Sequence, residues 1–255
     1  MARSKGLKKK DRRTSEEARW RGLPPPPLRE AYRAMRARFG HQGWWPGETP
    51  FEICVGAVLT QNTNWGNVER AIARLKAADL LSPQALYAAE FDRIAEAVRP
   101  AGYFRIKTKR LKAFVRVLVE EHGGNLERLF AGPVEEARQR LLAVQGIGPE
   151  TADSMLLYAG GRMSFVVDAY TRRIFERHGW APRGADYETV RAICSGALRR
   201  RDSDRQLDLW QDCHAQFVAV GKHFCRPRDP KCEACPLAEF LPRRKAAGKA
   251  AGGSR

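Results

Sequence analysis

Apolar residues recur at spacings of three and four along most of this 255-residue chain, and this spacing constrains its fold more than any other feature. It places apolar side chains on one face of a helix. Such runs alternate with short breaks from residue 51 onward, and one more, Leu28–Phe39, precedes them. β-branched residues are sparse, and the only short extended candidate is Ser164–Val167. The sequence therefore predicts an all-α protein.

The four prolines Pro24–Pro27 form a stop that no helix can cross. After them, and after Leu28–Phe39, the expected helices are Phe51–Thr60, Asn67–Ala77, Ser82–Ala89, Phe91–Val98, Ile106–Glu121, Asn125–Leu129, Val134–Ala143, Pro149–Ala159, Ala169–His178, Tyr187–Arg199 and Asp208–Phe224.

The net charge of +17 favours a polyanionic partner, most simply nucleic acid. Residues 1–22 carry +6 and residues 243–255 carry +5, so the two tails hold most of the charge. We expect both tails to be disordered basic segments, which would raise non-specific DNA affinity in a salt-dependent way. The charge alone is equally compatible with a ribosomal or a nucleoid protein.

No run of about 18 apolar residues occurs, so no transmembrane helix is expected. The first 13 residues are polar and basic, without the apolar stretch of a secretory signal. We therefore expect a protein of the cytoplasm, associated with the nucleoid and bacterial in origin.

A tight turn at Val144–Gly148 joins two of the expected helices. Gly146 and Gly148 have no Cβ and can adopt positive φ, so their N–H groups can approach a phosphate closely. Pro149 suits the first position of the next helix, whose N-terminus favours an anion. Ile147, between the glycines, would fix the turn to the core. An ordinary helix–helix corner has the same Gly-x-Gly pattern, so the turn by itself does not decide the function.

The motifs G-I-G-P-E-T-A-D (146–153) and V-V-D-A-Y-T-R-R-I (166–174) together resemble the helix-hairpin-helix (HhH-GPD) DNA glycosylases typified by endonuclease III. The resemblance covers most of residues 51–241. It implies an all-α fold of two helical lobes, with a DNA-binding cleft between them. It also implies that the hairpin grips the DNA backbone, through Gln145, Gly146, Ile147, Gly148 and Thr151.

Asp168 matches the acid that carries the chemistry in this family. Its position before a helical pattern is also typical of an N-cap, and the two roles are compatible. Cleaving an N-glycosidic bond builds positive charge on the sugar. A carboxylate beside it can stabilise that charge or activate water.

Bifunctional members of the family carry a lysine that attacks the sugar as a Schiff-base nucleophile. An ungapped match places Glu150 at that position, and a carboxylate cannot form an imine. We therefore predict a monofunctional glycosylase whose catalytic residues are Asp168 and Glu150. Lys222 could in principle substitute, but nothing in the sequence places it in the cleft.

The helix E-T-A-D-S-M-L-L-Y-A (150–159) is most similar to the 3-methyladenine DNA glycosylase III branch, although Gln216 stands where that branch carries a lysine. An alkylated purine already bears positive charge, so aromatic side chains could select it by cation–π attraction. We expect each of the following to be core rather than pocket: Trp44, Trp45, Trp65, Tyr103 and Phe104.

Two further segments match the family. In L-T-Q-N-T-x-W (59–65), the resemblance implies that Gln61 fills the duplex after the damaged base flips out. Polar residues there would equally suit a helix terminus. The segment 102–110 resembles a family turn whose cations touch phosphate or simply form a solvated face.

Three of the six cysteines form the dense pattern Cys225-x6-Cys232-x2-Cys235, whereas Cys54 and Cys194 lie in apolar helical settings. In an intracellular protein this clustering favours a metal site over disulfides, and the spacing permits zinc or an iron–sulfur cluster. The family resemblance implies a [4Fe–4S] cluster.

The fourth cysteine of the family pattern is missing, because position 241 is Leu241. Three explanations compete. Cys213 could act as the fourth thiolate, and this is the explanation that we favour. The site could instead have three cysteines with a labile ligand or a histidine, His223 or His214. The cluster could also have been lost.

We predict a helical barrel at 47–160 that includes the hairpin, facing a second lobe built from 23–46 and 161–242. The expected enzyme is a monomer that excises a flipped damaged base from double-stranded DNA, with alkylated purines such as 3-methyladenine favoured. The alternatives are an endonuclease III-like glycosylase and lyase on oxidised pyrimidines, a mismatch adenine or uracil glycosylase, and a non-catalytic DNA-binding homologue.

Overall fold

Helices account for nearly all the regular structure of the chain, of which the computed structural model describes residues 25–200 and 202–242. The predicted basic tails lie outside these residues. In chain order the elements are α2 (Leu28–Phe39), α3 (Pro50–Leu59), α4 (Trp65–Ala77), α5 (Pro83–Ala88), α6 (Phe91–Val98), η1 (Arg99–Ala101), α7 (Phe104–His122), α8 (Leu126–Leu129), α9 (Val134–Leu142), α10 (Pro149–Ser154), η2 (Met155–Ala159), α11 (Ala169–His178), α12 (Tyr187–Ala197), α13 (Ser203–His223) and η3 (Ala238–Phe240).

The all-α prediction is confirmed: within the described ranges no strand forms. The extended candidate at 164–167 is an irregular segment, because no second strand in the described part pairs with it. The helix predicted at 149–159 changes after Ser154 into a π-helical turn, η2. No helix in the described part is both long and apolar enough to cross a membrane.

Short polar residues fix where several helices begin. The Thr49 hydroxyl accepts a hydrogen bond from Glu52 N (3.1 Å), and Pro50 occupies the first helical position of α3. Asn64 caps α4 in the same way, accepting from Asn67 N at 3.1 Å. These caps explain why α3 and α4 start one or two residues earlier than their apolar patterns do.

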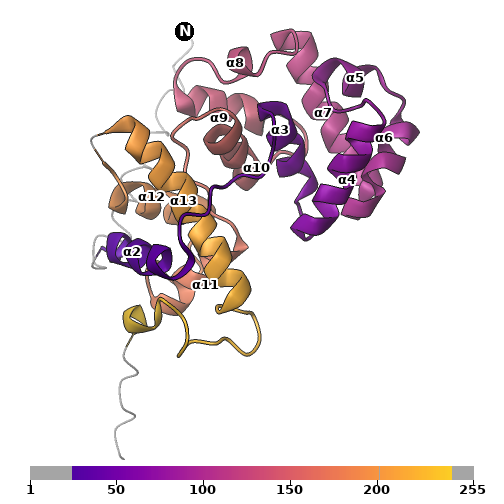
Figure 1. Cartoon of the computed structure of the whole chain (residues 1–255). Coiled ribbons are helices and arrows are strands. Elements are labelled where there is room, and N and C mark those ends of the chain that lie inside the picture. The colour runs from indigo at the N-terminus through magenta and orange to yellow at the C-terminus, as the bar shows by residue number, and fades with distance from the viewer. Residues whose placement is uncertain (1–24, 201, 243–255) are drawn as a thin grey trace, which may run out of the picture.

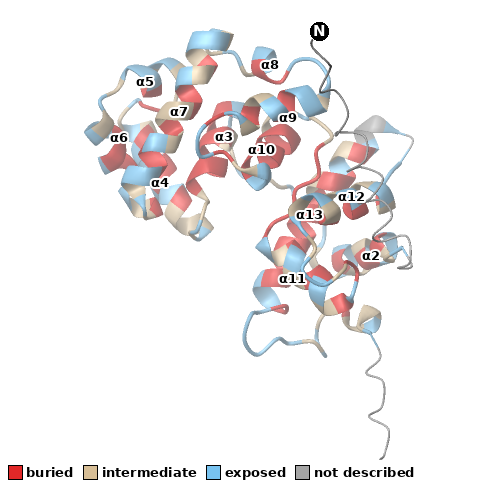
Figure 2. Cartoon of the chain, turned by 180° about the vertical axis from the view of Figure 1, so that it is seen from behind, coloured by how far each residue is buried: buried red, intermediate tan, exposed pale blue. Residues whose placement is uncertain are grey.

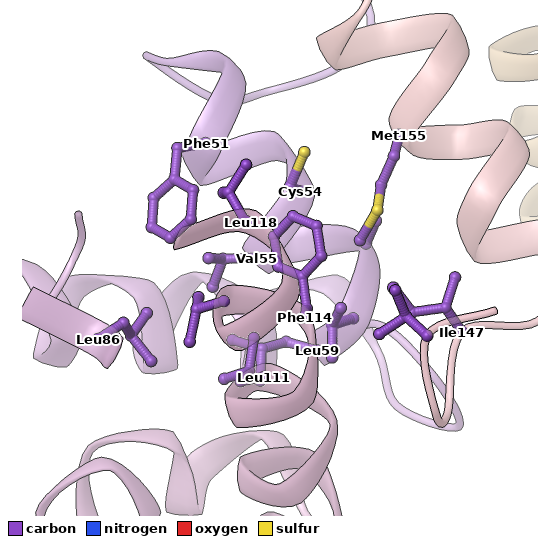
Figure 3. Close-up of a cluster of buried hydrophobic side chains, with 14 of the residues drawn as sticks. Phe51, Cys54, Val55, Leu59, Leu86, Leu111, Phe114, Leu118, Ile147 and Met155 are labelled. Atoms are coloured by element: carbon purple, nitrogen blue, oxygen red, sulfur yellow. The ribbon is translucent and has the colours of Figure 1, made fainter. Parts of the chain in front are cut away.

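One hydrophobic cluster lies among α3, α4, α6 and α7, which gather on one side of the molecule (Figure 1). Figure 3 shows Phe51 and Val55 of α3 among Phe114 and Leu118 of α7. The Phe51 and Phe114 rings stack with centroids 6.4 Å apart. Ile147 of the glycine turn is 5% exposed and belongs to this cluster, so the turn is fixed to the core as predicted.

A second cluster joins α2 to α11, α12 and α13, and Figure 2 shows this part of the chain apart from α4–α7. Segments from opposite ends of the sequence meet here. Leu28 and Met35 of α2 pack in the same cluster as Phe175 of α11 and Phe217 of α13. The two clusters meet within η2, where Leu156 belongs to the first and Leu157 to the second. The predicted lobe boundary at 160/161 stays a prediction.

A buried ionic network links α9, α10 and α12. Asp153 is fully buried, and its carboxylate forms a bidentate pair with Arg138 at 2.8 and 3.1 Å. The Tyr187 hydroxyl donates to the same carboxylate at 2.8 Å, and the Ser164 hydroxyl donates as well. Arg191 lies 3.7 Å away. The network therefore holds the helix that follows the glycine turn against two neighbours.

Candidate active site

A cleft of about 810 Å³ is lined by residues that lie beside the first hydrophobic cluster and by residues that lie beside the second. Its walls come from the loop before α3, the α3–α4 turn, the glycine turn with α10, the start of α11, and the second half of α13. These segments are far apart in the sequence, so the fold creates the site.

The glycine turn needs a glycine at only one of its two positions. Gly146 has φ +88°, and a Cβ there would lie 2.4 Å from Arg110 Cγ. Both the backbone conformation and the space exclude a larger residue. Gly148 has ordinary extended backbone, and a Cβ there would meet no atom within 4 Å. Because Gly148 has no side chain, the turn stays open where it borders the cleft.

Gln61 lies across this turn. Its Nε2 donates to Thr151 Oγ1 (2.8 Å) and to Gly146 O (3.3 Å), and Arg110 donates to its Oε1. The structure thus brings together Gln61, Gly146, Gly148 and Thr151, four of the residues predicted to contact DNA. Gln145 is exposed on the same turn but does not line the cleft.

Asp168 lies at the cleft wall as the N-cap of α11, and its Oδ1 accepts from Thr171 N at 2.7 Å. The side chain is buried, 8% of the residue being exposed. Burial alone would raise the pKa of this carboxyl. The adjacent His214 and the Thr171 N–H lower the pKa by more than burial raises it, so the net pKa lies below its ordinary value. Asp168 is therefore ionised at neutral pH.

His214 and Tyr158 form a chain of polar groups behind Asp168. His214 Nε2 lies 3.7 Å from Asp168 Oδ2, within ion-pair range but longer than a hydrogen bond. Its Nδ1 lies 2.6 Å from the Tyr158 hydroxyl. Burial and the charge of Asp168 raise the pKa of Tyr158 well above 10, so this hydroxyl stays neutral. Neither residue was predicted at this cleft: His214 was considered only as a cluster ligand, and Tyr158 only as part of the matched helix 150–159.

Glu150 faces the same cleft from the first turn of α10. The residue as a whole is exposed, but desolvation of its carboxyl at the cleft and the charge of Asp168 raise the pKa of Glu150 to about 7. The two acids therefore differ: Asp168 is ionised and Glu150 titrates near neutrality. Such a separation of carboxyl pKa values within one cleft is typical of acid–base sites.

Three tryptophans line the cleft, contrary to the expectation that they would all be core. Trp45 packs edge-on against Trp65, with ring centroids 5.3 Å apart, and lies 5.2 Å from the Tyr158 ring. Trp44 lies 6.5 Å from Trp65. A Cβ at Gly56 would lie 3.4 Å from both the Trp45 and the Trp65 rings, so this glycine makes room for them. The expectation is also wrong for Tyr103, which is exposed and is neither core nor part of the cleft lining.

Lys222 also lines the cleft, which the sequence did not indicate. Its Nζ lies 5.5 Å from the centre of the Trp44 ring, within cation–π range. Near it, Tyr170 packs against α13 at Gly221, where a Cβ would lie 2.2 Å from the Tyr170 ring. Among the described residues that line the cleft, Lys222 of α13 is thus the only lysine.

Two of the four cations in the segment 102–110 have different surroundings. Lys107 is buried, donates to Ala101 O at 2.6 Å, and has a pKa lowered to about 8 by desolvation. It therefore ties α7 to the preceding turn and touches neither solvent nor phosphate. Arg110 reaches the cleft through Gln61.

Cys225, Cys232 and Cys235 line one small cavity after α13, together with Leu241. Arg177 Nη1 donates to Cys225 Sγ at 3.2 Å, and Leu237 N donates to Cys235 Sγ at 3.5 Å. Such donors favour thiolates. Among the described side chains, no three His, Cys, Asp or Glu groups converge on a single metal-ion position.

The structure does not bring Cys213 to these three cysteines. Cys213 is buried inside α13, ten residues before the helix ends, which corresponds to about 15 Å along the axis. It lies near Cys194, whose pKa is raised first by burial and then by Cys213. Nor does His214 reach the cavity, because it lies at the cleft beside Asp168. A fixed helix therefore prevents the approach that linear spacing allowed.

Residues 55–200 match the model of the HhH-GPD superfamily base excision DNA repair proteins. The chain belongs to this family. It is thus a DNA glycosylase of base excision repair. Residues 225–240 match the iron–sulfur binding domain of endonuclease III, a match that ends one residue before Leu241.

Individual relatives agree with this assignment to the HhH-GPD family. The chain is 43% identical over 211 residues to the DNA repair glycosylase MJ1434 of Methanocaldococcus jannaschii, covering 82% of this chain and 93% of the relative. It is 30% identical over 198 residues to endonuclease III of Thermotoga maritima, covering 76% of this chain and 85% of that one.

Two solved structures have similar folds. One is the Helicobacter pylori 3-methyladenine DNA glycosylase MagIII bound to 1,N6-ethenoadenine, with a TM-score of 0.64 and 25% identity over 75% of this chain and 97% of that chain. The other is an endonuclease III–DNA complex, with a TM-score of 0.70 and 20% identity over 84% and 93% of the two chains. The second likeness shows the fold alone.

Proposed function

We propose that this glycosylase is monofunctional and that it hydrolyses the N-glycosidic bond of an alkylated purine, such as 3-methyladenine, flipped out of double-stranded DNA. The single observation that carries the proposal is the pair of acids in the cleft, with Glu150 at the family's lysine position and ionised Asp168 nearby. The similarity to MagIII, a 3-methyladenine glycosylase by name, supports the substrate class. The enzyme is proposed to act as a monomer.

In the proposed reaction, Asp168 stabilises the positive charge that develops on the deoxyribose and accepts a proton from water. The water oxygen bonds to C1′ while the C1′–N bond breaks, and the electron pair leaves with the base. A cationic base departs neutral, so no strong acid is required. His214 lies behind Asp168 and helps to keep its carboxylate ionised.

The walls of the cleft suit a flat cationic base. Trp44, Trp45 and Trp65 place aromatic rings at the cleft, and the face of such a ring attracts a desolvated cation. Glu150, once ionised, adds a negative charge on the same cleft. We propose that Gln61, together with the glycine turn, fills the space left in the duplex and holds the backbone.

A borohydride-trapping experiment tests the monofunctional mode. Wild type, Lys222→Ala and Glu150→Lys are incubated with duplex DNA containing an alkylated purine, and covalent adducts are counted. The proposal predicts base release without a wild-type adduct. Release by wild type but not by Asp168→Asn, at equal DNA affinity, would separate catalysis from simple binding. If neither protein releases any base from alkylated, oxidised and uracil-containing duplexes while both bind them, the chain is a non-catalytic homologue.

A second candidate is a bifunctional glycosylase and lyase that uses Lys222 as its amine. It is favoured by one observation, namely that Lys222 lines the cleft. In that case wild type forms a trapped adduct on oxidised pyrimidines and Lys222→Ala does not. The predicted loss of the adduct in this variant distinguishes the two modes directly.

For the cysteine cavity, the three cysteine side chains, two of which accept an N–H hydrogen bond at sulfur, fit a bound iron–sulfur cluster. When bound, such a cluster would supply structural cross-links within the loop after α13, and the proposed hydrolysis does not pass through it. Arg173, which donates to Cys225 O at 2.6 Å, holds the start of this loop to α11 without any metal.

A further inference from the structure

The cysteine cavity has three cysteine side chains, and an apolar side chain stands where a fourth ligand would be expected. Cys225 is buried, whereas Cys232, Cys235 and Leu241 are half-buried. Leu241 lies in the lining of the same cavity. A leucine side chain has no donor atom, so it cannot bind iron.

No other cysteine of the chain can take its place. The sequence contains six cysteines, and the structure describes all of them. Cys54 is fully buried in the cluster around α3 and α7, far along the chain from this loop. Cys194 and Cys213 are fully buried near each other within the helical core. Each is held inside a helix, so none can move to the cavity without unfolding that helix.

The one histidine at the cavity is committed elsewhere. His178 Nδ1 lies 2.8 Å from Ile174 O, and its Nε2 lies 3.3 Å from Leu237 O. Both ring nitrogens face backbone carbonyls. Ligation by this ring would therefore break a contact within α11 or one to the loop. His223 ends α13 among the rings of Phe39 and Phe224 and does not line the cavity.

We infer that only three residues of this chain, Cys225, Cys232 and Cys235, would bind the iron–sulfur cluster, and that a fourth iron, which Leu241 cannot ligate, would bind a small thiol from solution. Thiols are chosen because soft sulfur ligands suit this iron and because the Arg177 guanidinium, which donates to Cys225 Sγ, favours an anionic ligand. The inference concerns the cluster alone and does not depend on which base the enzyme removes.

The test uses the full chain, purified without oxygen with its cluster, as wild type, Leu241→Cys and Leu241→Ala. Each protein is treated with ferricyanide, and iron, sulfide and the electron paramagnetic resonance spectrum are measured. With an open corner, [4Fe–4S]2+ gives one electron to ferricyanide and releases one Fe2+, leaving paramagnetic [3Fe–4S]+. We expect this signal in wild type and in Leu241→Ala, and at least fivefold less of it in Leu241→Cys.

Leu241→Ala is the matched control, because it removes the leucine without adding a ligand and so separates packing from ligation. A second measurement identifies the ligand class. Adding a small monothiol to the reduced cluster should change the spectrum of wild type but not that of Leu241→Cys. Circular dichroism checks that every variant is folded.

Three results would overturn the inference. Wild type could resist ferricyanide as well as Leu241→Cys does, which would mean that a fourth protein ligand exists. Cys213→Ser could lose the cluster while remaining folded, which would identify that ligand. Finally, the purified protein could contain zinc and no sulfide, which would exclude an iron–sulfur cluster altogether.

Discussion

Replacing Asp153 with asparagine is expected to remove much of the stability of this fold. The change keeps the shape of the side chain but removes the negative charge from a fully buried site. Arg138, whose side chain is 5% exposed, then loses a bidentate partner, and Arg191 loses a charge at 3.7 Å. Removing one partner of a buried ion pair costs about 3–5 kcal/mol, because the remaining charge stays buried.

The lower end of that range applies here. Arg138 keeps a second partner in Glu188, at 2.5 Å, and Arg191 keeps contacts with Glu188 and Glu135. The Glu188 side chain is 45% exposed, so solvent screens its charge and it offsets only part of the lost attraction on Arg138. We therefore expect a loss of about 3 kcal/mol, which for a protein of this size lowers Tm by roughly 6–12 °C.

Urea unfolding followed by circular dichroism, together with calorimetry, measures this loss. Glu30→Gln is the control, because it breaks the exposed Arg33–Glu30 pair and should change stability by less than about 0.5 kcal/mol. Glu188→Gln removes the exposed partner of the same arginine and should cost about 1 kcal/mol or less. If Asp153→Asn costs no more than Glu188→Gln, the argument that burial sets the magnitude is refuted.

Three further outcomes are expected. Because the pKa of Glu150 is raised to about 7, its negative charge appears as the pH rises through 7. The value of kcat/KM on a cationic base should therefore rise roughly tenfold per pH unit up to pH 7. Glu150→Gln should lack this inflection, and a wild-type profile that is flat from pH 5 to 8 would contradict the proposed role. Gly146→Ala should lower stability by about 1–2 kcal/mol, whereas Gly148→Ala should leave it almost unchanged; equal effects would contradict the assigned backbone strain. Gln61→Ala should slow excision from duplex DNA by roughly tenfold or more and leave a single-stranded substrate unaffected; an equal loss on both would show that Gln61 acts on something other than the duplex.

The sequence was informative where neighbouring residues define a feature. The helices follow from apolar spacing, and the glycine turn from Gly146 to Pro149 is contiguous, so both were predictable. Asp168 was predictable as a cap because the cap bond joins it to Thr171, three residues away. Each of these features depends on local backbone geometry, which a short stretch of sequence encodes.

The rest of the site depends on packing between distant helices. Tyr158 and His214 are 56 residues apart, and only the packing of η2 against α13 places their polar atoms 2.6 Å apart. Lys222 reaches the cleft for the same reason, since it lies two turns further along α13 than His214. Cys213 is the converse case. It is only twelve residues from Cys225, but a rigid helix keeps the two apart.

One helix thus connects the two chemical sites of the molecule. α13 presents His214 and Lys222 to the cleft, and it ends where the loop with Cys225 begins. The helix α11 also contacts both sites. Asp168 caps its start at the cleft, and Arg177, near its end, donates to Cys225 Sγ. We predict that a change in the cysteine loop is transmitted to Asp168 through the packing of α11 on α13. On this argument, loss of the cluster should weaken base release by moving the acid, even though no step of the hydrolysis uses iron.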